Sequence, residues 1–278
     1  PAYLMILAFF FLQRKTSRVI TASLVAGLVV SVLLPLLVPI ISCPDPRGDY
    51  AVGSLIHHWV DGDRDEWFTP EDPNDKRQLM LQTWYPSIET NSEKLPFLDH
   101  LKIRAKTIAQ AGKFPSFLAM HLEKIKTNST LNSPVASNAA PFPIIIISHG
   151  ITGMRQLHTS LAEKLASSGF AVFAMDHTYD ANITVFPDGS IADYRSNIIG
   201  HPDSVSIRKK QIDTRVKDIQ FVTKELERIQ SGALRHTLNG YLDLSKIGIA
   251  GHSFGGSTAT LAAFQDDRYK AVVALDSW

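Results

Sequence analysis

Between Pro143 and Leu275 the chain alternates short apolar runs with longer segments of mixed polarity. The apolar runs are Pro143–Ile147, Phe170–Met175, Lys246–Ala250 and Ala271–Leu275. Such uninterrupted runs are typical of parallel strands that are buried on both faces. In one of the segments between them, Ser204–Gln230, apolar residues recur every three or four positions, as they do on one face of a helix. Strands that alternate with helices predict an α/β domain built on a mostly parallel sheet.

An antiparallel hairpin is expected at the start of this domain. Ser54–Val60 and Leu79–Tyr85 have the composition of strands, and Pro86 closes the second one. Residues 43–53 are rich in proline and glycine and are predicted to be a linker, so we place the domain at residues 54–278. A hydrophobic content of 45% with 20% charged residues excludes a disordered chain.

The sequence gives no reason to expect a nucleic acid, a metal or a cofactor. The formal net charge of +1 is too small for an electrostatic nucleic-acid site. Asp61, Asp63 and Asp65 resemble the start of a calcium-binding EF-hand loop, but Glu66 occupies the position that requires glycine. The single cysteine, Cys43, excludes an intrachain disulfide.

The first 42 residues differ in composition from the rest of the chain. Their only charged residues are Arg14, Lys15 and Arg18, which leaves 25 basic and 27 acidic side chains for the other 236 residues. The 24 residues from 19 to 42 carry no charge, and as a helix they would be about 36 Å long, enough to cross a bilayer. We therefore expect a membrane segment over residues 1–42, with a partial helix at 1–12, a basic turn at 13–18 and a transmembrane helix at 19–42.

The positions of the basic residues predict how this segment is oriented. Basic connections stay on the cytoplasmic side, so the turn at 13–18 is expected there and the globular domain on the extracytoplasmic side of the membrane. Two alternatives remain: a buried helix of a soluble protein, or a cleaved signal in which residues 40–43 act as a lipobox and Cys43 is lipidated.

The sharpest functional signal is GHSFGG at Gly251–Gly256, which fits the motif G-x-S-x-G. It follows the apolar run Lys246–Ala250 and precedes a helical segment, which is the context of a nucleophile elbow. The backbone of such a turn is strained, and the residues two positions before and after the nucleophile must be small. Gly251 and Gly255 meet this requirement, so we predict that Ser253 is a catalytic nucleophile. The alternative is a glycine-rich turn that contains a serine by chance.

Asp276 directly follows the apolar run Ala271–Leu275 and lies 23 residues after Ser253. One helix and one strand fit into this interval, so Asp276 is expected at the carboxyl end of the neighbouring strand. Catalytic residues of open α/β sheets collect at this edge. An aspartate there can orient a histidine and stabilise its imidazolium form, so we predict that Asp276 is the catalytic acid.

Two backbone amides are candidates for an oxyanion hole. In sites of this type one amide comes from the loop after the strand predicted at Pro143–Ile147, and the other from the residue after the nucleophile. These positions are Ile151 and Phe254. His149 precedes the nucleophile, whereas the histidine of this arrangement follows the acid, so we interpret His149 as structural.

The chain resembles the plasma-type (isoform II) platelet-activating factor acetylhydrolases and their bacterial relatives, which are serine esterases of the α/β-hydrolase fold. The specific parts of the match are SHG at 148–150, GHSFGG at 251–256 and LDSW at 275–278, within a similarity over much of residues 50–278. The resemblance assigns the nucleophile, acid and oxyanion positions to the same residues: Ser253, Asp276, Phe254 and Ile151. It also implies calcium-independent hydrolysis of short or oxidised acyl chains from phospholipids.

The catalytic histidine of that family follows the acid, whereas this chain stops two residues after Asp276. We therefore expect a C-terminally truncated α/β-hydrolase domain that is itself inactive and whose catalytic histidine is not in this chain. Three functions stay open: a membrane-tethered esterase acting on phospholipids, a general carboxylesterase acting on soluble esters, and a non-catalytic binding protein anchored to a membrane.

Overall fold

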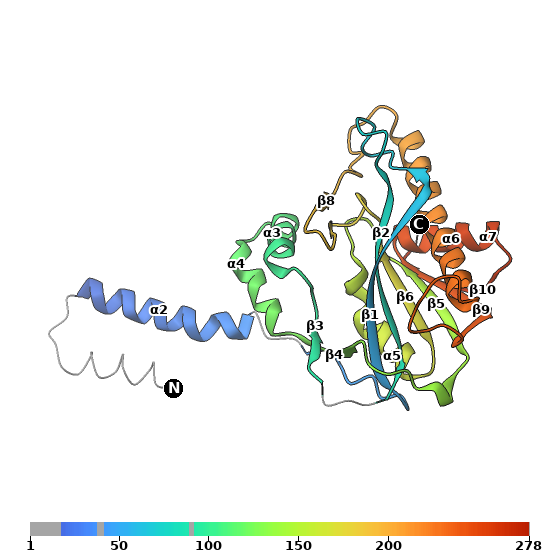
Figure 1. Ribbon diagram of the computed structural model, residues 1–278. Helices are drawn as coiled ribbons and strands as arrows, with labels where there is room; N and C mark the ends of the chain where they lie inside the picture. Colours follow the sequence, from blue (N-terminus) through green and yellow to red (C-terminus); the bar gives the residue numbers. More distant parts are fainter. Residues whose placement is uncertain (1–17, 38–41, 89–91, 278) are drawn as a thin grey trace. The chain divides into compact units, whose positions relative to one another are not determined.

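The computed structural model describes residues 18–37, 42–88 and 92–277, and the chain divides into two compact units between Ile41 and Ser42. The first unit contains helix α2 (Arg18–Leu37), which is blue in Figure 1. The second unit contains all the other helices and strands that the structure describes.

Helix α2 differs from the transmembrane helix that we expected at residues 19–42. Its described part covers the 20 residues Arg18–Leu37 and includes the charged Arg18, while residues 38–41 of the predicted span lie outside the described residues. Across the described ranges, no helix has both the length and the apolar character needed to cross a membrane. The predictions of a transmembrane segment and of a membrane-anchored protein with an extracytoplasmic domain are therefore wrong. The partial helix at 1–12 and most of the basic turn at 13–18 lie outside the described residues.

The second unit is built on an eight-stranded sheet with the strand order β10-β9-β5-β6-β2-β1-β4-β3. Its strands are β1 (Ala51–Asp65), β2 (Lys76–Ser87), β3 (Lys94–Pro96), β4 (Lys126–Leu131), β5 (Phe142–Ser148), β6 (Ala171–Asp176), β9 (Leu242–His252) and β10 (Tyr269–Leu275). The four strands β10, β9, β5 and β6 run parallel, and β1 and β2 form an antiparallel hairpin. The predictions of a parallel sheet core and of an N-terminal hairpin are confirmed.

The hairpin is longer than the sequence pattern indicated. Strand β1 begins at Ala51, inside the predicted linker, because Ala51 already pairs with Ser87 of β2. The pairing continues to Asp65 and Lys76, past an irregularity after Asp61. A second, two-stranded sheet is formed by β7 (Ile183–Val185) and β8 (Ile191–Asp193).

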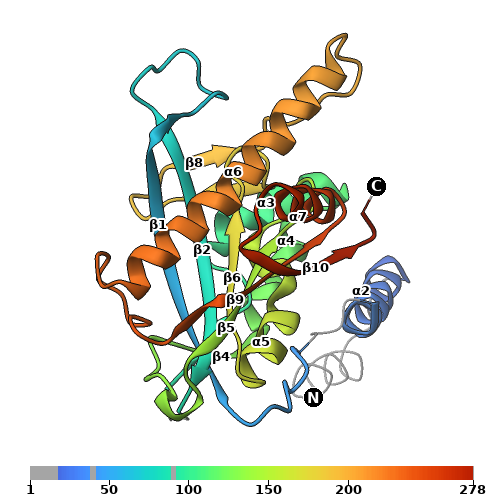
Figure 2. The same ribbon diagram turned by 90° about the vertical axis from the view of Figure 1, so that its right-hand side faces the viewer.

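Helices cover both faces of the central sheet (Figures 1 and 2). Successive residues of a strand point to opposite faces. Ile144 and Ile146 of β5 accordingly pack with apolar residues of α6 (Ser204–Gln230) and α7 (Phe254–Gln265). Ile147 packs on the other side with residues of α5 (Thr159–Ser167). Burial on both faces is why these strands are continuous apolar runs. The remaining helical segments are α3 (Leu101–Gly112), α4 (Ser116–Ala119), η1 (Met120–Lys124), η2 (Ser137–Ala139) and η3 (Arg155–His158).

A pair of histidines joins β1 to the segment between α6 and β9. The Nε2 atoms of His57 and His236 are 3.1 Å apart. The N–H of Leu238 donates to Nδ1 of His236, so neutral His236 has its proton on Nε2 and donates it to His57. Burial lowers the pKa of His57 to about 3, with a further contribution from His236, and burial lowers the pKa of His236 to about 4.

This pair predicts that the free energy of unfolding decreases as the pH falls from about 6.5 to about 4. In the unfolded chain both histidines regain a pKa of about 6.5, so below that pH the unfolded state binds protons that the folded state does not. Each histidine contributes a slope of up to about 1.4 kcal/mol per pH unit. Urea unfolding at a series of pH values measures the slope, which should be smaller in His236→Asn. Equal slopes in the variant and the wild type would contradict this account.

Candidate active site

Ser253 is the single residue between β9 and α7. Its backbone angles, φ 54° and ψ −124°, lie in a region that non-glycine residues rarely adopt. Such a conformation persists only where the surrounding structure imposes it, and it is concentrated at functional sites. Serine is a preferred N-cap residue, yet the Ser253 hydroxyl makes no capping hydrogen bond to α7. The turn therefore holds this hydroxyl at the end of the strand without using it to stabilise the helix.

The geometry of the turn explains why two of its residues are glycines. A Cβ atom on Gly251 would lie 2.1 Å from the carbonyl oxygen of Gly255. A Cβ atom on Gly255 would lie 2.1 Å from the carbonyl oxygen of Ser148 in β5. Both clashes are with backbone atoms, so no change of side-chain rotamer could relieve them.

Asp276 lies beside Ser253 at the same edge of the sheet. Leu275 of β10 is opposite His252 of the parallel strand β9, so Asp276 and Ser253 are the next residues after the paired positions. The N–H of Ser253 donates a hydrogen bond of 2.8 Å to the carbonyl oxygen of Leu275, which joins the two strand ends. Asp276 is exposed and has a φ of 48°, also in the left-handed region.

The loop that contains Ile151 approaches the nucleophile from the other side of β9. A Cβ atom on Gly150 would lie 3.3 Å from the Cβ of Ser253, so the loop backbone lies close to the elbow. The carbonyl oxygen of Gly150 accepts a hydrogen bond of 3.0 Å from the N–H of Gly153. Because a trans peptide is planar, the N–H of Ile151 points away from that carbonyl.

The amide of Phe254 belongs to the first turn of α7. The carbonyl oxygen of Ser253 accepts hydrogen bonds from the N–H groups of Gly256 and Ser257, at 2.8 and 3.2 Å. The N–H of Phe254, in the same planar peptide, therefore points out of the N-terminal end of the helix. This end has a partial positive charge that favours a developing negative charge. The structure thus places Phe254, Asp276 and Gly150, the residue before Ile151, next to Ser253.

His149 is buried and binds the loop backbone rather than the nucleophile. Its Nε2 accepts the backbone N–H of His177 over 3.0 Å, so its proton lies on Nδ1 and is donated to the carbonyl oxygen of Gly150 over 2.5 Å. Burial, reinforced by the charge of Arg215, lowers the pKa of His149 well below its ordinary value. Within residues 42–88 and 92–277, no histidine hydrogen-bonds the hydroxyl of Ser253 or the carboxylate of Asp276.

Sequence reasoning missed a buried polar chain beneath the loop. The hydroxyl of Ser148 lies 2.9 Å from Nε2 of His177, and Nδ1 of His177 lies 2.9 Å from a carboxylate oxygen of Asp218. The residue types are those of a catalytic triad. All three side chains are fully buried, however, so we interpret this series of hydrogen bonds as structural. Burial lowers the pKa of His177 to about 4. The sequence feature that could have indicated these hydrogen bonds is Asp218, a charged residue among the buried residues of Ser204–Gln230.

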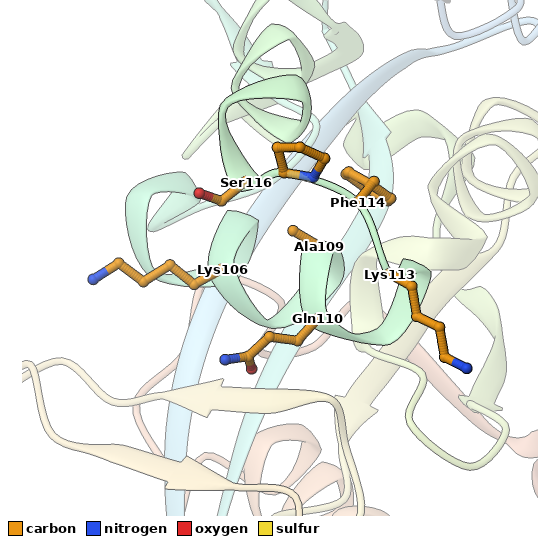
Figure 3. A pocket seen from close by; sticks show the side chains of 7 residues that line it. Lys106, Ala109, Gln110, Lys113, Phe114 and Ser116 are labelled. Carbon is orange, nitrogen blue, oxygen red and sulfur yellow. The ribbon is translucent and has the colours of Figure 1, made fainter.

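A pocket of about 670 Å³ lies over α3 and the turn before α4 (Figure 3). It is lined by Lys106, Ala109, Gln110, Lys113, Phe114, Pro115 and Ser116. The lining includes none of the predicted site residues, so we do not assign the pocket to the active site.

In the part of the chain that the structure describes, no cluster of three or more His, Cys, Asp or Glu side chains could hold a metal ion.

The family model and the most similar curated proteins that we compared point to the same protein family. Residues 41–278 match the model of platelet-activating factor acetylhydrolase, isoform II. A platelet-activating factor acetylhydrolase from Canis lupus familiaris is 26% identical over 221 residues, which are 72% of this chain and 50% of that protein. A probable 1-alkyl-2-acetylglycerophosphocholine esterase from Arthroderma benhamiae is 30% identical over 134 residues, 48% of this chain and 31% of that protein.

A solved structure supports the same assignment. The ferulic acid esterase from Streptomyces cinnamoneus aligns with a TM-score of 0.65 and 28% identity, over 82% of this chain and 59% of that one. The chain thus spans about half the length of the Canis protein, while the family model covers it from residue 41 to its last residue. The chain belongs to the family of platelet-activating factor acetylhydrolases, isoform II.

Proposed function

We propose that this protein is a serine hydrolase that cleaves carboxylic esters. Ser253 is the nucleophile, Asp276 is the acid, and the amides of Ile151 and Phe254 form the oxyanion hole. The observation that carries this proposal is the turn at Ser253. Its strained backbone conformation is of a kind that costs about 1–3 kcal/mol, and the Ser253 hydroxyl makes no capping hydrogen bond to α7. A non-catalytic binding protein has no need for that strain.

The proposed reaction proceeds through an acyl-enzyme. The Oγ of Ser253 forms a bond to the ester carbonyl carbon while its proton passes to a histidine, and the two amides stabilise the negative carbonyl oxygen. The ester C–O bond then breaks and the histidine returns the proton to the leaving alcohol. Water, activated by the same histidine, releases the acid and restores the serine. We propose a histidine outside residues 1–278 for this role, oriented by Asp276, because no described histidine hydrogen-bonds the Ser253 hydroxyl.

For the substrate we propose phospholipids with short or oxidised acyl chains. Support comes from the names of the relatives, which include platelet-activating factor acetylhydrolase and 1-alkyl-2-acetylglycerophosphocholine esterase. A general carboxylesterase acting on soluble esters is the second candidate. It is favoured by the similarity to a ferulic acid esterase, which extends over 82% of this chain.

A substrate series in the full-length protein separates the two candidates. We expect kcat/KM for a phospholipid with an sn-2 acetyl chain to exceed that for the palmitoyl analogue by about tenfold or more, because a pocket shaped for a short chain excludes a long one. EDTA should leave the rate unchanged, and Ser253→Ala provides the blank. Hydrolysis of a feruloyl ester without hydrolysis of any phospholipid would favour the second candidate, and hydrolysis of neither would contradict both.

A further inference from the structure

A buried arginine lies directly behind the proposed oxyanion hole. Arg215, on the buried stripe of α6, is only 1% exposed, so no substrate reaches it. Its Nη1 donates to the carbonyl oxygen of His149 over 2.6 Å, and its Nη2 donates to that of Gly150 over 3.4 Å. Its Cζ also lies 4.8 Å from the centre of the Phe254 ring. One side chain thus contacts the segments that provide both proposed oxyanion donors.

Arg215 is itself held by Asp180. Its Nε donates to a carboxylate oxygen of Asp180, which is also nearly fully buried. Burial alone would raise the pKa of Asp180, but Arg215 lowers it below its ordinary value, so the carboxylate stays charged. Separating the pair would leave a buried charge without a partner. The backbone carbonyl of Asp180 also accepts the N–H of Thr152 over 3.2 Å, so the same pair holds the loop on both sides of Ile151.

The carbonyl of Gly150 matters because of the group at the other end of its peptide. This carbonyl and the N–H of Ile151 belong to one planar trans peptide and point in opposite directions. Arg215 holds this carbonyl together with the N–H of Gly153 and Nδ1 of His149, and donors that fix the carbonyl also fix the direction of the Ile151 N–H. A charged donor also polarises the peptide, which makes that N–H a stronger hydrogen-bond donor toward an oxyanion.

We propose that Arg215 is a positioning residue for the oxyanion hole, which holds the Gly150–Ile151 peptide so that its N–H faces the reacting carbonyl oxygen. This inference rests on the proposed function of Ser253. Arg215 itself touches no substrate, so it can affect the reaction only through the oxyanion hole beside Ser253. An oxyanion donor acts on the transition state more than on the bound ester. Loss of the arginine fork should therefore lower kcat and leave KM nearly unchanged.

The test is Arg215→Lys in the full-length protein, which keeps the positive charge but removes the fork that reaches two carbonyls at once. We expect kcat per titrated active site to fall by about 100-fold, as it does when one oxyanion donor is lost, with KM close to the wild-type value. Arg104→Lys is the matched control. Arg104 is equally buried, but it donates to Asp99 and to the carbonyl of Ile183. Among the described residues, its one hydrogen bond near the loop goes to the sulfur of Met154 over 3.9 Å, and none goes to a backbone group of residues 149–153. The control should keep its kcat.

Hydrogen exchange of the amides at residues 149–153 gives a second readout that does not depend on activity. Exchange should be faster in Arg215→Lys than in the wild type and unchanged in Arg104→Lys. If Arg215→Lys does not fold, Asp180→Asn, which releases the guanidinium, should shift kcat and exchange in the same directions. A folded Arg215 variant with wild-type kcat and wild-type exchange would overturn the proposal. Undiminished hydrolysis by Ser253→Ala would instead reject the proposed function, and exchange would still decide whether Arg215 fixes the loop.

Discussion

Ser253→Ala is expected to reduce the kcat of the full-length protein on a short-chain ester by about a million-fold. Alanine has no atom that could form the acyl-enzyme, and no neighbouring side chain can take the place of a hydroxyl held in this turn. The residual rate should come only from substrate binding and the oxyanion amides. Initial rates at saturating substrate measure this loss directly.

Ser245→Ala is the matched control for this experiment. Ser245 is an exposed serine at the opposite end of the same strand, where its hydroxyl donates to Asp243. Its removal should leave kcat unchanged. If Ser253→Ala kept more than about a hundredth of the wild-type kcat, the assignment of Ser253 as nucleophile would be wrong, because even the mildest triad substitution costs far more.

Asp276→Asn is expected to lower kcat by about 10⁴-fold. Asparagine is nearly the same size, so the strand end should keep its shape, but it cannot stabilise an imidazolium and it favours the wrong tautomer of the histidine. Asp267→Asn, an exposed residue in the turn before β10, controls for the loss of one negative charge. A loss of less than about tenfold in Asp276→Asn would indicate that another residue orients the base.

The nucleophile turn and the parallel strands are predictable from the sequence, because both leave local sequence patterns. The elbow requires glycine at positions 251 and 255, and the structure shows backbone clashes that any Cβ there would cause. Strand β5 is apolar from Phe142 to Ile147 because one face packs on α6 and the other on α5. Each requirement leaves a pattern within a few consecutive residues, so it is visible in the sequence even where distant segments impose it.

Contacts between distant segments were beyond sequence reasoning. Strand β4 has the polar sequence KTNSTL, which has no strand pattern of its own. It forms because residues 129–131 pair with β1, while buried Glu163 accepts hydrogen bonds from the backbone N–H of Asn128 and the hydroxyl of Ser129. The partners Arg215 and Asp180 are likewise 35 positions apart, and nothing in either local sequence identifies the other.

The transmembrane prediction shows the limit of reasoning from composition. The uncharged stretch at 19–42 predicts one continuous transmembrane helix, whereas the structure describes a helix at Arg18–Leu37 that does not meet the requirements for crossing a membrane. The absence of charges does not by itself establish that a segment spans a bilayer.

Labelling with a fluorophosphonate tests the central assignment most directly. The reagent phosphonylates an activated serine, and peptide mapping by mass spectrometry identifies which one. We expect the full-length protein to be modified at one site, in the peptide that contains Ser253, and Ser253→Ala to remain unmodified. Labelling of another serine, such as Ser148 in the buried chain, or no labelling of an active wild-type protein, would contradict the assignment of Ser253 as the catalytic nucleophile.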